Sequence, residues 1–231
     1  EEVAWIFKAE DLTSAPVVDD DDRLIGVITI DDVVDVITEE AQEDIMKLGG
    51  AAQGDIYREV GEVSLLRGRW LLVNLLTALL ASAVISLFEG TIDKLVALAV
   101  LMPIVASMGG NAGTQTLTVA VRALATRELS SANAWRVIGK ETLIGAINGV
   151  SFAVMTGLVA GLWFENVMLG VVIGAAMIIN LIAAGLFGAM IPIALEKLGA
   201  DPAVSSTVFL TTVTDVVGFF AFLGLASIFL L

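Results

Sequence analysis

A single acidic residue lies near the middle of the last long apolar segment of the chain. This segment runs from Val204 to Leu231, and Asp215 is its only ionisable side chain. With a rise of about 1.5 Å per residue, Asp215 would lie about 20 Å along a helix that begins at Pro202. A carboxylate at that depth in a bilayer is costly unless it faces protein or water, so Asp215 is predicted to be a functional residue.

Two hydroxyl side chains and a glycine share the predicted helical face of Asp215. Thr207 and Thr211 precede it by two turns and one turn, and Gly218 follows it by just under one turn. A stripe of hydroxyls that leads to a carboxylate is suited to the wall of a cation pathway. The alternative is structural, because a buried aspartate can be protonated and join helices as a hydrogen-bond donor, or pair with a buried base.

The second apolar segment carries a polar cluster at membrane depth. Pro103 removes a helical hydrogen bond. The cluster that follows consists of Asn111, Thr114, Gln115 and Thr118, with Gly109, Gly110 and Gly113 beside it. Such polar groups are tolerated at this depth where they face protein or a watery cavity. A structural kink would account for the proline and one glycine but not for the two amides one turn apart, so a pore lining is favoured.

The elements that must position these residues are membrane helices. Hydrophobic residues make up 57% of the 231 residues, which is typical of an integral membrane protein. Five apolar segments are long enough to cross a bilayer; they are predicted at residues 70–88, 95–121, 137–164, 167–191 and 204–231. Among the flanking basic residues only Lys94 falls on the opposite side, which predicts a cytoplasmic N-terminus and an extracytoplasmic C-terminus in the plasma (inner) membrane.

Small residues and two asparagines are predicted to join the membrane helices. Glycines recur one turn apart in the pairs Gly145 and Gly149, Gly157 and Gly161, and Gly170 and Gly174. Such pairs allow membrane helices to approach closely, so their predicted role is packing. Asn148 and Asn180 are likewise predicted to form hydrogen bonds between helices rather than to bind ions.

The N-terminal part of the chain is acidic. Residues 1–66 account for the whole net charge of −14, since residues 67–231 carry equal numbers of acidic and basic side chains. Acidic clusters attract cations and repel nucleic acid, so the expected small partner is a metal ion and no nucleic acid is expected. The chain contains no cysteine and no histidine, which excludes thiolate metal sites and the usual zinc ligand. Nothing resembles a nucleophile with its base, so no enzyme is predicted.

The acidic part predicts a truncated α/β fragment followed by a long helix. The predicted elements are the end of a helix at residues 1–9, a β-hairpin of strands 14–18 and 24–29, and a helix from Asp31 to Leu48 that stops at Gly49-Gly50. This order resembles the second half of a CBS motif, which cannot bury a core by itself. Since the chain begins without Met and inside this pattern, we expect an upstream part to be missing.

Taken together, the motifs resemble the MgtE family of magnesium transport proteins over essentially the whole chain. In the second segment they are Pro103, Gly110-Asn111, Gly113 and Gln115; in the last they are Asp201-Pro202 and Thr214-Asp215 followed by Gly218. Residues 122–129 and the CBS-like half add to the likeness. The resemblance implies an all-α membrane protein with three parts: the end of a CBS domain (1–30), an acidic connecting "plug" helix and linker (31–66), and a five-helix pore domain (67–231).

What the resemblance implies for function is a homodimeric Mg²⁺ channel embedded in membrane lipid. Asp215 would select the ion, and the pore lining would comprise Pro103, Gly110, Asn111, Gly113, Thr114, Gln115, Thr207, Thr211 and Gly218. The family's Mg²⁺-sensing acids match Asp11, Asp32, Asp35, Glu40, Glu43 and Asp44. Cytoplasmic Mg²⁺ would screen the repulsion between acidic surfaces and so hold the plug helices closed. A truncated chain would lack acids contributed from upstream.

Two other functions remain open on the residues alone. One is a secondary exchanger that moves a divalent cation against Na⁺ or H⁺ with Asp215 as the carrier. The other is a membrane sensor without conduction, in which Asp215 only joins helices. The permeant ion is open as well, because Mg²⁺, Mn²⁺, Co²⁺ and Ca²⁺ all accept oxygen ligands.

Overall fold

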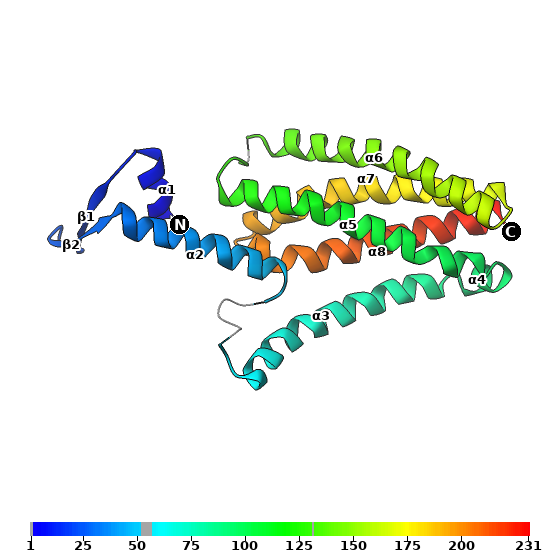
Figure 1. Cartoon of the computed structure of the whole chain (residues 1–231), viewed down its shortest axis with the longest axis horizontal. Helices are drawn as coiled ribbons and strands as arrows, with labels where there is room; N and C mark the ends of the chain where they lie inside the picture. Colours follow the sequence, from blue (N-terminus) through cyan, green and yellow to red (C-terminus); the bar gives the residue numbers. More distant parts are fainter. Residues whose placement is uncertain (1, 52–56, 131) are drawn as a thin grey trace. The chain divides into compact units, whose positions relative to one another are not determined.

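The computed structural model describes residues 2–51, 57–130 and 132–231 of the chain. Within them the chain forms eight helices and one two-stranded sheet (Figure 1). In chain order these are α1 (Glu2–Ala9), β1 (Ser14–Val18), β2 (Leu24–Thr29), α2 (Ile30–Leu48), α3 (Val60–Ser86), α4 (Glu89–Lys94), α5 (Ala97–Ala125), α6 (Ala134–Trp163), α7 (Val167–Lys197) and α8 (Pro202–Phe229). The chain divides into two compact units, one up to Leu66 and one from Arg67 onward. Glu1 and residues 52–56 of the predicted linker lie outside the described part.

The first unit contains the predicted hairpin and the predicted helix. The strands pair antiparallel with Ser14 opposite Thr29, and the register shifts between Val17 and Val18. Thr29 then caps α2: its N–H donates to the Asp32 carboxylate at 3.1 Å, and its hydroxyl accepts from the N–H of Asp32. The helix ends at Gly49 and Gly50, where Gly50 has a φ of 67° that glycine adopts without strain.

The core of this unit is small. Ala4 and Phe7 of α1 and Val33 of α2 are its buried residues. On β2, Leu24 and Ile25 are 67% and 66% exposed. A unit of this size buries little apolar surface, in agreement with the expectation that a CBS half forms no complete core.

The second unit consists mainly of helices long and apolar enough to cross a membrane. Among the described residues there are five such helices, namely α3, α5, α6, α7 and α8, and the predicted all-α fold with five membrane helices is confirmed. The start of the first helix was predicted wrongly: α3 begins at Val60 rather than Trp70, because the more polar residues before Trp70 continue the same helix. The short helix α4 was not predicted.

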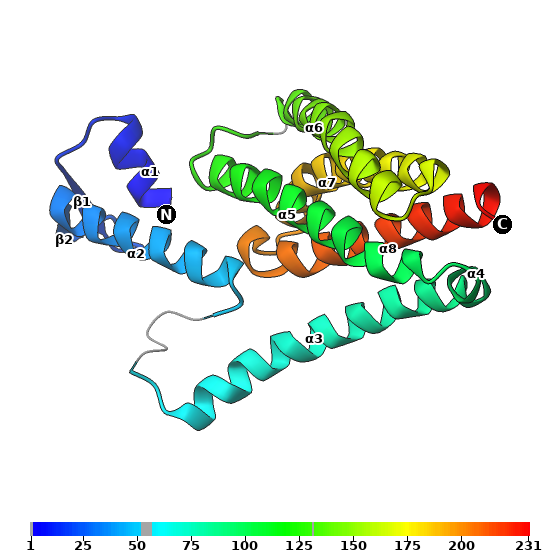
Figure 2. The ribbon, with the colours of Figure 1, turned by 45° about the vertical axis from the view of Figure 1, so that its right-hand side comes forward.

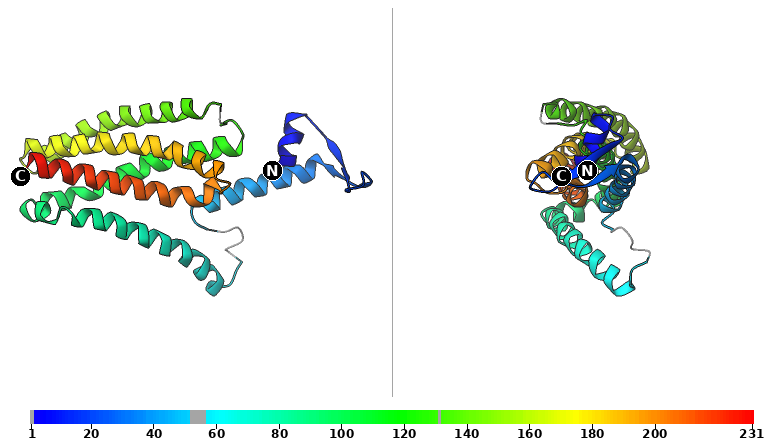
Figure 3. Two further views of the ribbon diagram at one scale, coloured as in Figure 1. Left: turned by 180° about the vertical axis from the view of Figure 1, so that it is seen from behind. Right: turned by 90° about the vertical axis from the view of Figure 1, so that its left-hand side faces the viewer.

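Helix α7 occupies the middle of the membrane unit. It contacts α5, α6 and α8, and Figure 3 shows it between α6 and α8. It is the most buried of the five candidate membrane helices, whereas Ala81 is the buried residue of α3. A Cβ at Gly145 would lie 2.4 Å from the carbonyl oxygen of Leu181, and one at Gly170 would lie 2.4 Å from that of Gly157. The predicted packing role of these glycines is therefore confirmed.

Helix α5 crosses α7 and α8 as one continuous element (Figure 2). It passes through Pro103 without interruption. Its buried residues Leu98, Leu101 and Val105 belong to the same apolar cluster as Phe222 and Leu223 of α8. This cluster holds the two helices that carry the polar residues of interest.

Candidate ion pathway

Asp215 lies within α8, the helix predicted to carry it. The helix begins at Pro202, where the Asp201 side chain accepts a hydrogen bond from the N–H of Ala203 at 2.8 Å. Asp215 is half-buried. Among the described residues no side chain forms a hydrogen bond or an ion pair with its carboxylate, and no base lies beside it. Of the structural alternatives, pairing with a basic residue of the same subunit is therefore not observed.

The hydroxyls on α8 bond back to their own helix. Thr211 Oγ1 donates to the carbonyl oxygens of Thr207 and Val208, both at 3.1 Å, and the buried Thr214 donates to that of Leu210 at 3.1 Å. A hydroxyl that donates its proton to a backbone carbonyl in a hydrogen bond still has oxygen lone pairs, which can bind a cation or accept a hydrogen bond from a water of its hydration shell. Thr207 and Thr211 are half-buried, as Asp215 is.

The polar cluster of α5 lies on the exposed face of that helix. Asn111, Thr114, Gln115 and Thr118 are exposed, and Ser107, which was not predicted, is exposed and accepts a hydrogen bond from Asn111 Nδ2 at 3.3 Å. The opposite face, with Gly109, Gly113 and Thr116, is buried against the other helices. The structure therefore does not bury these polar groups within the subunit.

Of the three glycines predicted to line the pore, two pack against neighbouring helices and one faces open space. A Cβ at Gly113 would lie 2.9 Å from Leu210 of α8, and one at Gly218 would lie 2.6 Å from Asn180 Nδ2 of α7. A Cβ at Gly110, in contrast, would meet nothing within 4 Å. Gly113 and Gly218 thus set the spacing of the helices inside the subunit, and Pro103 lies exposed on α5.

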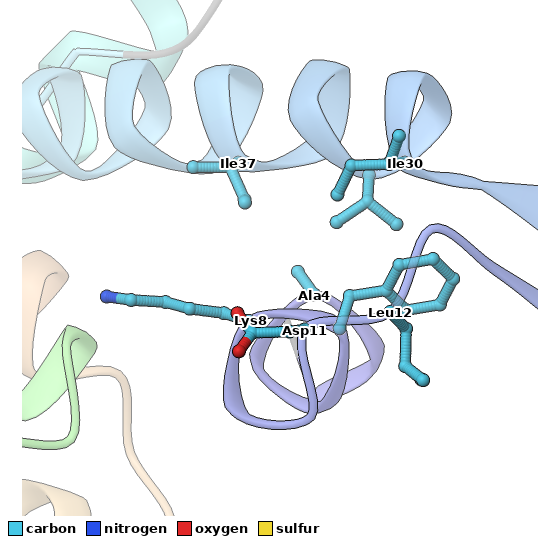
Figure 4. Close-up of a pocket in the computed structure, with 8 residues that line it drawn as sticks. Ala4, Lys8, Asp11, Leu12, Ile30 and Ile37 are labelled. Carbon is cyan, nitrogen blue, oxygen red and sulfur yellow. The ribbon is translucent and has the colours of Figure 1, made fainter.

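The predicted regulatory acids are spread over the first unit. Asp11 lies at the edge of an open, mostly apolar hollow of about 340 Å³ between α1 and α2, with Lys8 on the same side (Figure 4). Asp32 caps α2, and Glu43 pairs with Lys47 at 2.8 Å. Asp35 is exposed and Glu40 half-buried, and the side chain of Asp44 lies outside the described part. Across the described residues no three acidic side chains gather closely enough to hold a metal ion.

Two buried polar side chains connect the membrane helices. Asn180 of α7 donates to the carbonyl oxygen of Val105 at 2.8 Å, which confirms the prediction made for it. Asn148 is exposed and forms no side-chain hydrogen bond with another described residue, so the same prediction is wrong for Asn148 within the subunit. Glu141 of α6 was missed: it is 8% exposed and accepts a hydrogen bond from Thr116 Oγ1 at 3.3 Å. Glu141 lies within the predicted segment 137–164, but no role was predicted for it.

The fold and the site define a multi-pass membrane protein whose polar groups at membrane depth concentrate on two neighbouring helices. The sequence profile of the MgtE family, described as a divalent cation transporter, matches residues 102–225, and that of the CBS domain matches residues 1–39. The chain belongs to the MgtE family.

Named relatives extend the similarity over the whole chain. The chain is 39% identical over its full length to "Magnesium transporter MgtE" of Thermus thermophilus, and 36% and 34% identical to the proteins of that name from Enterococcus faecalis and Bacillus subtilis. It spans 52% of the first relative and 51% of each of the other two. The chain therefore corresponds to about half the length of these relatives.

Proposed function

We propose that this chain forms the membrane part of a channel that moves Mg²⁺ and related divalent cations across the plasma (inner) membrane. The observation that carries this proposal is Asp215, a half-buried carboxylate without a protein partner among the described residues, at membrane depth on α8. Family membership supports it, as do the relatives named as magnesium transporters.

Mg²⁺ itself is the substrate, and its chemistry suits one carboxylate per subunit. The ion gives up water reluctantly and is usually held by one or two carboxylates with several waters retained. Asp215 would supply the charge, while the lone pairs of Thr211 and Thr207 would accept hydrogen bonds from the retained waters. In a low-dielectric surrounding the attraction between the carboxylate and the ion is stronger than in bulk water.

The second half of the pathway would come from another copy of the chain. The exposed stripe of Asn111, Thr114, Gln115 and Thr118 lies opposite the packed face of α5. Polar groups at membrane depth must face protein or water. A parallel homodimer satisfies this requirement, because two such stripes and two Asp215 carboxylates would then border one aqueous path, with membrane lipid around it.

The acidic first unit is the proposed regulatory part, on the cytoplasmic side. We assign residues 1–30 to the end of a CBS domain, 31–66 to the connecting helix and linker, and 67–231 to the pore. Repulsion between acidic surfaces is relieved when cations bind them, so cytoplasmic Mg²⁺ would favour the closed state. The acids proposed for this role are Asp11, Asp32, Asp35, Glu40, Glu43 and Asp44.

The test compares Mg²⁺ uptake into liposomes by the wild type, Asp215→Asn and Asp215→Glu. Asp215→Asn keeps the shape of the side chain but removes the charge, so Mg²⁺ flux or its selectivity over Ca²⁺ should fall sharply. Asp215→Glu keeps the charge and should be milder. Asp93→Asn, the same change at an exposed acid of α4, is the matched control. Wild-type uptake that stops without an opposed Na⁺ or H⁺ gradient would indicate an exchanger, and unchanged flux and selectivity in Asp215→Asn would refute the assignment of Asp215.

A further inference from the structure

Asn180 lies where three membrane helices meet. It belongs to α7, its side chain is fully buried, and its Nδ2 donates to the carbonyl oxygen of Val105 on α5 at 2.8 Å. On its other side it contacts Gly218 of α8. One amide group therefore touches both helices that carry the proposed ion pathway, although α7 itself carries none of the proposed lining residues.

Two glycines make the space that this amide occupies. A Cβ at Gly109 of α5 would lie 2.2 Å from Asn180 Nδ2, and a Cβ at Gly218 of α8 would lie 2.6 Å from the same atom. Both distances are far below any real carbon–nitrogen contact, so a side chain at either position would force the amide of Asn180 to move. The amide acts as a spacer between the backbones of α5 and α8.

This spacer lies close to Asp215 along α8. Gly218 follows Asp215 by three residues, which corresponds to about 4.5 Å along the helix axis. Thr214, next to Asp215, is fully buried and fixes the rotation of the helix at this level. On α5, Gly109 precedes the exposed Asn111 by two residues. A shift of either helix at the amide would therefore move residues of the proposed pathway.

Stability alone does not account for an asparagine at this position. Asn180 Oδ1 is buried and has no hydrogen-bond partner among the described residues. An unsatisfied buried oxygen is destabilising, whereas a leucine of similar size would carry no such penalty. The asparagine offers what leucine lacks, namely a donor that ties α7 to the Val105 carbonyl.

We propose that Asn180 is a positioning residue for Asp215, an inference that rests on the proposed function of the pathway. Its hydrogen bond to α5 and its contact with Gly218 hold α8 at a set distance from α5. This distance determines how closely the Asp215 carboxylate approaches a hydrated ion, and so how well Mg²⁺ is distinguished from the larger Ca²⁺.

The experiment measures two properties of Asn180→Ala, Asn180→Leu and the matched control Asn148→Ala, which changes an exposed asparagine of α6. The first is the ratio of Mg²⁺ to Ca²⁺ flux in liposomes, normalised to folded protein. Loss of the hydrogen bond should lower this ratio, because α8 would no longer be held at a set distance from α5. A purely structural role would lower the amount of folded protein and leave the ratio unchanged.

The second property does not depend on transport. Because the chain has no cysteine, a single spin label can be attached at Phe209→Cys, an exposed position of α8. The label should become more mobile in Asn180→Ala and Asn180→Leu but not in Asn148→Ala. If Asn180→Ala does not fold, Asn180→Leu, which retains the volume, gives both readouts.

The outcomes separate the inference from the proposed function. A changed label spectrum in a protein whose wild type transports no Mg²⁺ would support the positioning of α8 by Asn180 and reject the channel. A flux ratio and a label spectrum that both match the wild type in the Asn180 variants would overturn the role of Asn180, whatever the transport result.

Discussion

Replacing Gly145 of α6 by alanine should destabilise the membrane unit. A Cβ at this position would lie 2.4 Å from the carbonyl oxygen of Leu181 and 3.2 Å from its carbonyl carbon. Ordinary contacts begin near 3.4 Å, so α6 and α7 would have to separate locally by about 1 Å, a gap that forfeits a quarter to a half of each dispersion contact. Overpacking typically costs about 1–3 kcal/mol, and alanine returns up to about 1 kcal/mol through its higher helix propensity. We expect a net loss of about 1–2 kcal/mol.

Gly139→Ala provides the control, since it makes the same change on the same helix. Gly139 is exposed, and a Cβ there would meet nothing within 4 Å. This variant should be neutral or more stable by up to about 1 kcal/mol. Thermal unfolding in detergent, followed by tryptophan fluorescence, should place the Tm of Gly145→Ala about 2–12 °C below that of Gly139→Ala. Equal Tm values would refute the close packing of α6 on α7.

Two further changes test hydrogen bonds seen in the two units. Thr116→Val removes the donor to the buried Glu141 and should cost about 1–3 kcal/mol of unfolding free energy in the same thermal assay, whereas Thr118→Val, at an exposed position of α5, should cost little. The Thr29 hydroxyl holds the pKa of Asp31 below its usual value, so Thr29→Val should raise that pKa in an NMR titration. The stability linked to Asp31 is present above the pKa of the unfolded carboxyl and is lost as pH falls through the lowered folded-state value. This loss on acidification should be smaller in Thr29→Val, where the backbone N–H groups of Asp31 and Asp32 are the remaining donors that lower the pKa.

Elements defined by local signals could be predicted from the sequence. The hairpin and α2 are bounded by an acidic turn, by the capping pair Thr29 and Asp32 and by Gly49-Gly50, all of which act within a few residues. The membrane helices follow from long apolar runs, and the α6–α7 contact follows from glycines one turn apart. The depth of Asp215 follows from its place in an uninterrupted apolar segment.

Features that depend on distant residues could not be predicted. The burial of Glu141 on α6 depends on its contact with Thr116, which lies on the preceding membrane helix α5. The hydrogen-bond acceptor of Asn180 is the carbonyl oxygen of Val105, 75 residues away. That the Oδ1 of Asn180 has no hydrogen-bond partner among the described residues could not be predicted from the sequence either. Asn148 looked equivalent to Asn180, but it lies on the outer face of α6. The early start of α3 was missed because apolar content, the signal used, is weak between Val60 and Arg69.

The central position of α7 has a consequence for the biogenesis of this protein. Helix α5 leaves the ribosome before the helix against which much of its buried face, including Gly109 and Gly113, will pack. Until then this face, with its glycines and Thr116, lies against lipid or the insertion machinery rather than against protein. We therefore expect α5 to reach its final packing only after α7 has been synthesised, and a nascent chain that stops before Val167 leaves this face of α5 without its partner helix.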